Sequence, residues 1–235
     1  MKKIWTLILF IGLVMTACTH LNVNGSNNGF LGSTLNLNEA LYIVDLDDSN
    51  NILIFEQIKD DFTFTTDVGG EGTYFNGQMD FFIDKPALSL FKPISDIFDV
   101  FVFNEEENYY TFLENELALA FYKSLSYSDP LARFAMLRTL ETPKGMFGRE
   151  YASETQWDFV IYVYVDRDVT ITAKGATLQK WATLITDDLN IDLKTGWNAI
   201  HYHVKLSSTD HFTTINSGNP SYLRWSRPSD RYTAH

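Results

Sequence analysis

Alternating apolar and polar positions dominate the chain after residue 39. Hydrophobic side chains recur at every second position over residues 41–46, 52–58 and 62–66, with turn-forming residues between these segments. A period of two places the apolar side chains on one face of a strand, half-buried in a sheet. The same pattern continues over residues 73–83, 98–103, 109–113, 169–174, 181–186, 191–193 and 197–206. The pattern therefore predicts a mostly β body.

Residues 157–165 are apolar on both alternating faces. A strand of this kind lies inside a sheet, with a layer packed on each side. The segment 115–126 differs, because Leu117, Phe121 and Leu125 recur four apart, as on one face of a helix. We therefore expect antiparallel β-sandwich modules with at most one or two short helices.

Residues 142–149 contain Pro143, Gly145 and Gly148, which are typical of a break between structural units. We place a domain boundary there. The prediction is an N-terminal β-sandwich-like domain over residues 39–148 and a C-terminal β-sandwich domain over residues 149–235.

The N-terminus has a different pattern. Lys2 and Lys3 precede an apolar run over residues 4–14, and small residues follow up to Cys18. The run ends after too few residues to cross a bilayer as a helix, which takes about 20. A basic start, a short apolar segment and small residues are typical of a removable export signal.

The segment Met15-Thr16-Ala17-Cys18 resembles the lipobox of bacterial lipoprotein precursors. The resemblance implies cleavage before Cys18, with residues 1–17 as signal peptide, and acylation of Cys18 with lipid chains such as palmitate. Cys18 is the one cysteine of the chain, so no thiol remains for disulfides. The expected location is the bacterial cell envelope, lipid-anchored in a membrane and facing the periplasm or the cell exterior.

Residues 19–38 contain six Asn, three Gly and two Ser. This composition is typical of a flexible linker, which at this length spans about 25 Å. We predict that residues 18–38 are the lipidated cysteine and a tether.

The tract 162–172, together with residues 193–198, resembles uncharacterised bacterial lipoproteins of β-sandwich type. The resemblance implies a fold and a compartment, and it assigns no activity to any residue.

The chain carries 30 acidic and 18 basic residues, a net charge of −12. Removal of Lys2 and Lys3 with the signal leaves 16 basic residues and a net charge of −14. Nucleic-acid binding needs basic clusters that displace counterions from phosphates, so we expect no nucleic-acid partner.

The acidic loop at residues 45–56 resembles the calcium loop of EF-hand proteins, with oxygen ligands at alternate positions and Glu56 at the twelfth. Flanking strands would carry Glu56 too far away, because a strand rises about 3.3 Å per residue. A hairpin loop rich in turn formers is the simpler interpretation. The alternative is a partial Ca²⁺ site made by Asp45, Asp47, Ser49 and Asn51.

His201 and His203 share one face of a predicted strand, a spacing found in metal sites. The opposite face carries Ile200, Tyr202 and Val204, so we expect both histidines on a solvated face beside Trp197 and Ala199. The alternative is a zinc site completed by Asp210 or His211.

Four of the five tryptophans lie beyond residue 156. Exposed flat rings stack on sugar faces, so this distribution suggests glycan binding. The candidates are Trp197, Tyr222 and Trp225.

Motifs of hydrolases, zinc proteases and nucleotide-binding proteins are absent from the sequence, so we expect no enzyme. The sequence predicts a lipid-anchored cell-envelope protein that acts as a surface binding or structural component. Its expected partners are the membrane, through the lipid anchor, and another envelope protein or a glycan. A glycan- or calcium-binding module and an envelope hydrolase are the alternatives.

Overall fold

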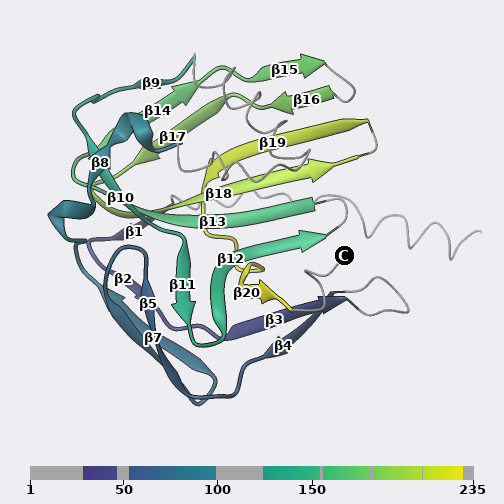
Figure 1. Cartoon of the computed structure of the whole chain (residues 1–235). Helices are drawn as coiled ribbons and strands as arrows, with labels where there is room; N and C mark the ends of the chain where they lie inside the picture. Colours follow the sequence, from purple (N-terminus) through teal and green to yellow (C-terminus); the bar gives the residue numbers. More distant parts are fainter. Residues whose placement is uncertain are drawn as a thin grey trace, which may run out of the picture.

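The computed structural model describes residues 29–46, 53–98, 124–153, 156–179, 183–207 and 209–229. The predicted fold class is confirmed, since the chain is mostly β and sandwich-like, with two short 3-10 turns. Among the described residues, seventeen strands are linked in one hydrogen-bonded sheet, and three others form a second sheet in the order β17-β14-β9. Figure 1 shows β14 and β17 above β18 and β13, with β5 and β7 below them.

The first part of the chain forms short strands and both 3-10 turns. Its elements are β1 (Phe30–Gly32), β2 (Leu35–Leu37), β3 (Leu41–Leu46), β4 (Leu53–Gln57), β5 (Phe62–Thr66), β6 (Glu71–Phe75), β7 (Gln78–Ile83), η1 (Leu88–Leu90), β8 (Lys92–Pro93) and η2 (Ile94–Asp96).

The second part contains the longer strands. Its elements are β9 (Ser126–Tyr127), β10 (Arg133–Leu137), β11 (Thr139–Thr142), β12 (Gly145–Ser153), β13 (Gln156–Val165), β14 (Val169–Ala173), β15 (Ala176–Gln179), β16 (Thr183–Thr186), β17 (Leu189–Leu193), β18 (Gly196–Leu206), β19 (Asp210–Ser217) and β20 (Arg224–Pro228).

Strand β13 lies at the centre of the large sheet, as its apolar pattern predicts. It pairs antiparallel with β10, β12 and β18. Val160, Tyr162 and Tyr164 pack into one hydrophobic core, and the alternate residues of β13, among them Ile161 and Val163, pack into a second. Both faces of β13 are therefore buried, each in a different core.

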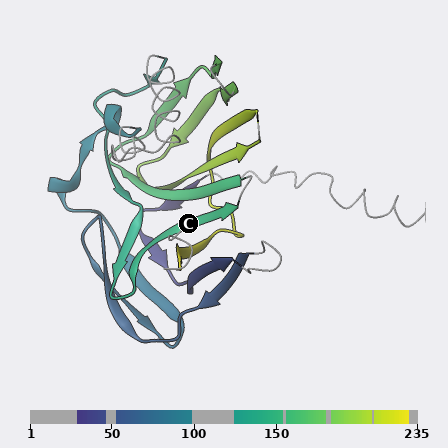
Figure 2. The same cartoon turned by 45° about the vertical axis from the view of Figure 1, so that its right-hand side comes forward.

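In the described part of the chain, most neighbouring strands are antiparallel and two pairs are parallel. β16 pairs in parallel with β19, and β20 pairs in parallel with β3. The second of these pairings joins the end of the chain to its beginning, with Trp225 opposite Leu41. Figures 1 and 2 show β3, β4 and β7 at the opposite end of the molecule from β15 and β16.

The structure corrects the predicted extent of the tether. Residues 30–32 form β1, which pairs with β18, and residues 35–37 form β2, which pairs with β7. Leu35 and Leu37 are buried in the first core. The prediction of a flexible tether is therefore wrong for these two strands, because alternate leucines in β2 supply enough apolar surface to hold it against the core. Cys18 lies outside the described residues.

The predicted domain boundary falls inside β12, a continuous strand of nine residues. Pro143 and Lys144 form the turn between β11 and β12, and Gly145 follows with a φ of 109°. Pairings such as β12 with β20 and β5 with β11 also join elements from different parts of the chain. Pro143 and Gly145 thus mark a hairpin turn here, which requires the same residue types as a linker.

The segment with an alternating pattern over residues 73–83 is a hairpin. Asn76 and Gly77 form its turn with φ values of 51° and 79°, and an Asn-Gly pair is favoured in two-residue turns because both positions need a positive φ. Apart from Phe98, the expected strands over residues 98–103 and 109–113 lie outside the described residues, and so does the expected helix over 115–126 before residue 124.

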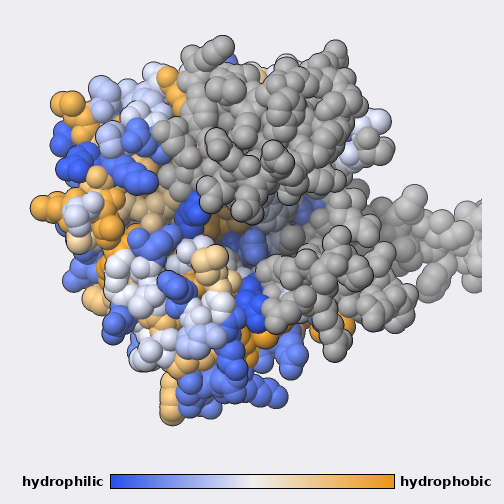
Figure 3. Space-filling view, in the orientation of Figure 1, coloured by the Kyte–Doolittle hydropathy of each residue, from blue (hydrophilic) through white to orange (hydrophobic). Residues whose placement is uncertain are grey.

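Among the described residues, no helix combines the length and the apolar character that a membrane span requires. The surface is mixed in polarity. Figure 3 shows hydrophobic surface along the left edge of that view, on the side where Figure 1 places β8.

Candidate functional site

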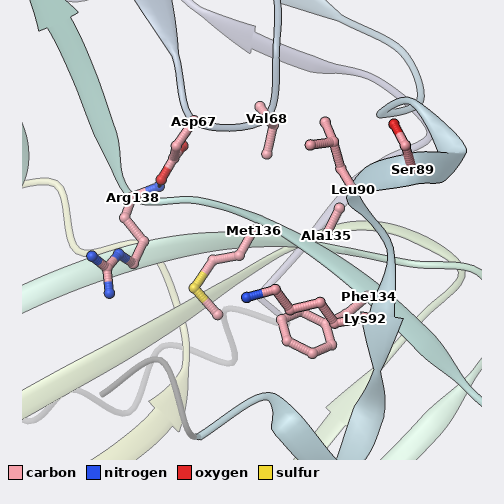
Figure 4. A pocket seen from close by; sticks show the side chains of 9 residues that line it. All are labelled: Asp67, Val68, Ser89, Leu90, Lys92, Phe134, Ala135, Met136 and Arg138. Atoms are coloured by element: carbon pink, nitrogen blue, oxygen red, sulfur yellow. Dashed lines mark hydrogen bonds between the residues drawn. The ribbon is translucent and has the colours of Figure 1, made fainter. Parts of the chain in front are cut away.

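A cavity of about 330 Å³ lies beside β10. We call it the β10 cavity. Its lining comes from the loop after β5, from η1 and β8, and from β10 itself, as Figure 4 shows. The lining residues are Asp67, Val68, Ser89, Leu90, Lys92, Phe134, Ala135, Met136 and Arg138. Its volume is at the lower end of the range for small-molecule sites.

The cavity is next to a gap in the strand pairing of β10. On one edge, Phe134, Ala135, Met136 and Leu137 all pair with β13. On the other edge β8 pairs only with Arg133 and Phe134. Further along that edge, the carboxylate of Asp67 accepts the backbone N–H of Arg138 at 3.1 and 3.2 Å. Within the described residues, β10 therefore has no strand partner on this edge from Ala135 to Leu137.

The backbone of Met136 points to this open edge. On the same edge, the carbonyl of Ala132 accepts a hydrogen bond from the N–H of Ile94, and the N–H of Arg138 donates to the carboxylate of Asp67. Backbone groups of alternate residues in a strand point to the same edge. Met136 lies two residues before Arg138, so its N–H and C=O face the cavity.

The cavity also lies where the two hydrophobic cores meet. Val68 and Ala135 belong to the first core, and Phe134 belongs to the second. Figure 4 shows Val68 and Leu90 on one side of the β10 ribbon and Met136 and Lys92 on the other. A ligand in the cavity would thus contact apolar side chains on both faces of the strand.

The polar groups of the cavity carry charges of both signs. Desolvation of the Asp67 carboxyl raises its pKa to about 6, against the lowering effect of the Arg138 backbone N–H and of the Arg138 charge. Lys92 is exposed at the opposite end of the gap. The site therefore offers an anion near Arg138 and a cation near Phe134, with hydrogen-bonding backbone between them.

A second cluster of polar side chains lies at strands β13 and β18, beside the first core. We call Gln156, Asp158, His201, His203 and Tyr222 the Asp158 cluster. Asp158 is fully buried and its Oδ1 accepts from His201 Nε2 at 2.9 Å and from His203 Nδ1 at 2.7 Å. Gln156 donates to Oδ2, and the ring of Tyr222 packs edge-on against His201.

This cluster holds the carboxylate of Asp158 ionised. Burial would raise the pKa of Asp158, but the hydrogen bonds from His201, His203 and Gln156 outweigh burial and hold it well below its usual range. Burial and the adjacent Asp158 raise the pKa of the Tyr222 hydroxyl. When the histidines are neutral, these bonds leave His201 Nδ1 and His203 Nε2 as hydrogen-bond acceptors.

The prediction that this face of β18 is exposed to solvent is wrong. Trp197 and Ala199 are fully buried, and His201 is only 9% exposed. This face of β18 packs against the first core. Its histidines therefore form hydrogen bonds with the buried carboxylate of Asp158. Among the described residues, no three histidine, cysteine or acidic side chains are arranged to hold a metal ion, which gives the zinc alternative no geometric support.

The three candidate glycan-binding residues differ in their exposure to solvent. Trp197 and Trp225 are 0% exposed, so the prediction that these rings lie at the surface is wrong. Trp197 Nε1 donates to the carbonyl of Asp84 at 2.6 Å, and Trp225 stacks on Tyr162 at 6.0 Å. Tyr222 is 49% exposed and belongs to the Asp158 cluster.

Of the proposed calcium ligands, Asp45 lies in β3 opposite Ile54 of β4. Asp47, Ser49 and Asn51 lie outside the described residues. The strands that flank this loop form the predicted hairpin, and the partial Ca²⁺ site stays a prediction.

Sequence reasoning missed both Asp158 and the β10 cavity. Asp158 is the one charged residue in the segment 157–165, and a lone acid in a strand buried on both faces signals a buried partner. The cavity has no comparable signal, because it depends on where the pairings of β8 and β13 with β10 end.

No family model, no curated protein and no solved structure matches the chain. The case for function therefore depends on this chain's own residues.

Proposed function

We propose that this protein is a lipid-anchored component of the bacterial cell envelope that binds a small ligand. The observation that carries the binding part is the β10 cavity, with apolar side chains from both cores and charges of both signs. A purely structural component would not need an open cavity at a sheet edge. Most ligand sites combine a largely apolar lining with a few polar groups, as this cavity does.

The proposed anchor is Cys18, at the end of the predicted export signal. The segment between Cys18 and β1 would connect the lipid to the sheet. Two or more acyl chains make a stable anchor, because each buried CH₂ contributes about 0.8 kcal/mol. The acidic body, with a net charge of −14 once the signal is removed, would be repelled by anionic headgroups.

Metabolic labelling with a palmitate analogue tests the anchor. The wild-type protein is expected to take up the label and to fractionate with membranes. The Cys18→Ser variant should lose both properties. Label retained in that variant would overturn the proposed anchor.

Site-specific photo-crosslinking in intact cells tests the binding part. Benzoylphenylalanine replaces Met136 in one variant and the exposed Phe75 of β6 in the control. A crosslinked species is expected at residue 136 and not at residue 75. Failure to crosslink at residue 136, or equal crosslinking at both, would contradict a ligand in the cavity.

A further inference from the structure

We propose that the β10 cavity binds a free tripeptide or dipeptide, which adds a short antiparallel strand to the open edge of β10. This inference rests on the proposed binding function and names the ligand class of that site. Peptides that add to a sheet edge gain affinity from backbone hydrogen bonds and specificity from alternate side-chain pockets.

The backbone of β10 supplies the first requirement. Met136 faces the cavity with its N–H and C=O, between Phe134, which pairs with Lys92, and Arg138, which bonds to Asp67. A strand placed there would bond to Met136 as β8 bonds further along. A fatty acid could not reproduce a donor and an acceptor at this spacing.

The lining on both sides of β10 supplies the second requirement. Successive side chains of a strand point to opposite faces. One peptide side chain would lie against Val68, Leu90 and Ala135, and the next against Phe134 and Met136. An unbranched acyl chain would fill one face and leave the other empty.

The two ends of the gap supply the third requirement. Lys92 stands at the β8 end and, among the described residues, forms no ion pair, so it can receive the peptide's carboxylate. Asp67 stands at the other end, beside Arg138, and can receive the peptide's ammonium group. A peptide held this way runs antiparallel to β10.

The length of the gap limits the peptide. Among the described residues, β10 has no partner on this edge over Ala135, Met136 and Leu137, which span about 10 Å at 3.3 Å per residue. Two or three peptide residues fill that length. A longer peptide would meet β8 at one end and the loop at Asp67 at the other.

Calorimetric titration of the full-length mature protein in detergent tests the proposal. The probes are Ala-Leu-Ala, its N-acetyl form, its C-terminal amide and octanoate. Ala-Leu-Ala is expected to bind saturably, with each blocked form at least about tenfold weaker because one charge pair is lost. Octanoate binding as tight as Ala-Leu-Ala, or no saturable tripeptide binding, would overturn the peptide assignment.

Two substitutions test which end of the peptide each charged residue binds. Lys92→Met should abolish the preference for the free carboxylate, and Asp67→Asn the preference for the free amine. Lys85→Met is the matched control, since Lys85 lies over Phe91 and outside the cavity lining. If Lys85→Met weakens tripeptide binding as much as Lys92→Met, the binding is general charge attraction and the proposed end is wrong.

Hydrogen exchange supplies an independent readout. Bound tripeptide is expected to slow exchange of the Met136 amide at least about tenfold, because a new backbone bond protects it. The Val163 amide, in β13, should not change. Crosslinks at residue 136 without tripeptide binding would leave the binding function intact and exclude this ligand class.

Discussion

His203 Nδ1 lies 2.7 Å from Oδ1 of Asp158, directly across the β13–β18 ladder. His201, two residues earlier in β18, reaches the same oxygen at 2.9 Å. One buried carboxylate thus holds two histidines on one face of the sheet. These hydrogen bonds are strongest while the carboxylate is charged.

Replacing the carboxylate should destabilise the fold strongly. In Asp158→Asn, one acceptor oxygen becomes a donor group, so buried hydrogen bonds are lost. We expect the free energy of unfolding in urea to fall by about 2–3 kcal/mol, the range for a bond to a charged group. Asp80→Asn, at an exposed position of β7, should change it by less than about 0.5 kcal/mol. Equal losses in both variants would contradict a special role for Asp158.

The same carboxylate predicts a loss of stability in acid. The pKa of Asp158 is lower in the folded protein than in the unfolded chain, where it is about 3.9. Its contribution is complete above about pH 4 and is lost as the pH falls toward the folded-state value. The stability difference between wild type and Asp158→Asn should therefore be constant above about pH 4 and shrink below it. A difference that grows in acid would refute this sign.

Asp67 should have the opposite effect on how stability depends on pH. Its folded-state pKa of about 6 lies above the unfolded value, so the folded protein binds the proton more tightly. Its contribution therefore makes the protein less stable as the pH rises from about 4 to 6. Asp67→Asn should remove this decline in urea unfolding curves. Direct titration of the Asp67 carboxyl carbon by NMR should give a midpoint near 6, and a midpoint near 4 would contradict the prediction.

Trp225 should behave as a core residue. It is fully buried and packs against Tyr162. We expect Trp225→Ala to lower the free energy of unfolding by about 3–5 kcal/mol, the usual cost of removing a buried aromatic ring. Phe75→Ala, at a ring that is 68% exposed, is the aromatic control and should cost less than about 1 kcal/mol. A neutral Trp225→Ala variant would restore the prediction of a surface ring.

Gly72 of β6 leaves room for a neighbouring aromatic ring. A Cβ at this position would lie 2.2 Å from the ring of Phe64, which is buried. Gly72→Ala should therefore destabilise the protein by about 1–3 kcal/mol through overpacking. Gly218→Ala is the control, because nothing lies within 4 Å of a Cβ there. Thermal unfolding that shifts equally in both variants would rule out the contact with Phe64 as the cause.

The sequence by itself determined the mostly β class and the position of many strands. β5 and β3 begin and end where the alternating pattern predicts, and β14 ends one residue earlier than predicted. One face of each strand packs against a core and the other faces solvent. The period of two is therefore visible in the sequence of each strand alone. The centrality of β13 was also predictable, because both of its faces are apolar.

The tertiary structure alone decided which faces of β18 are buried and how distant strands pair. Trp197, Ala199 and His201 alternate with an apolar set, and a period of two cannot distinguish a solvated face from one covered by a second core. The covering layer comes from residues far away in the chain, such as β2 and β20. The Asp158 cluster and the β10 cavity follow from that long-range pairing, which no local pattern encodes.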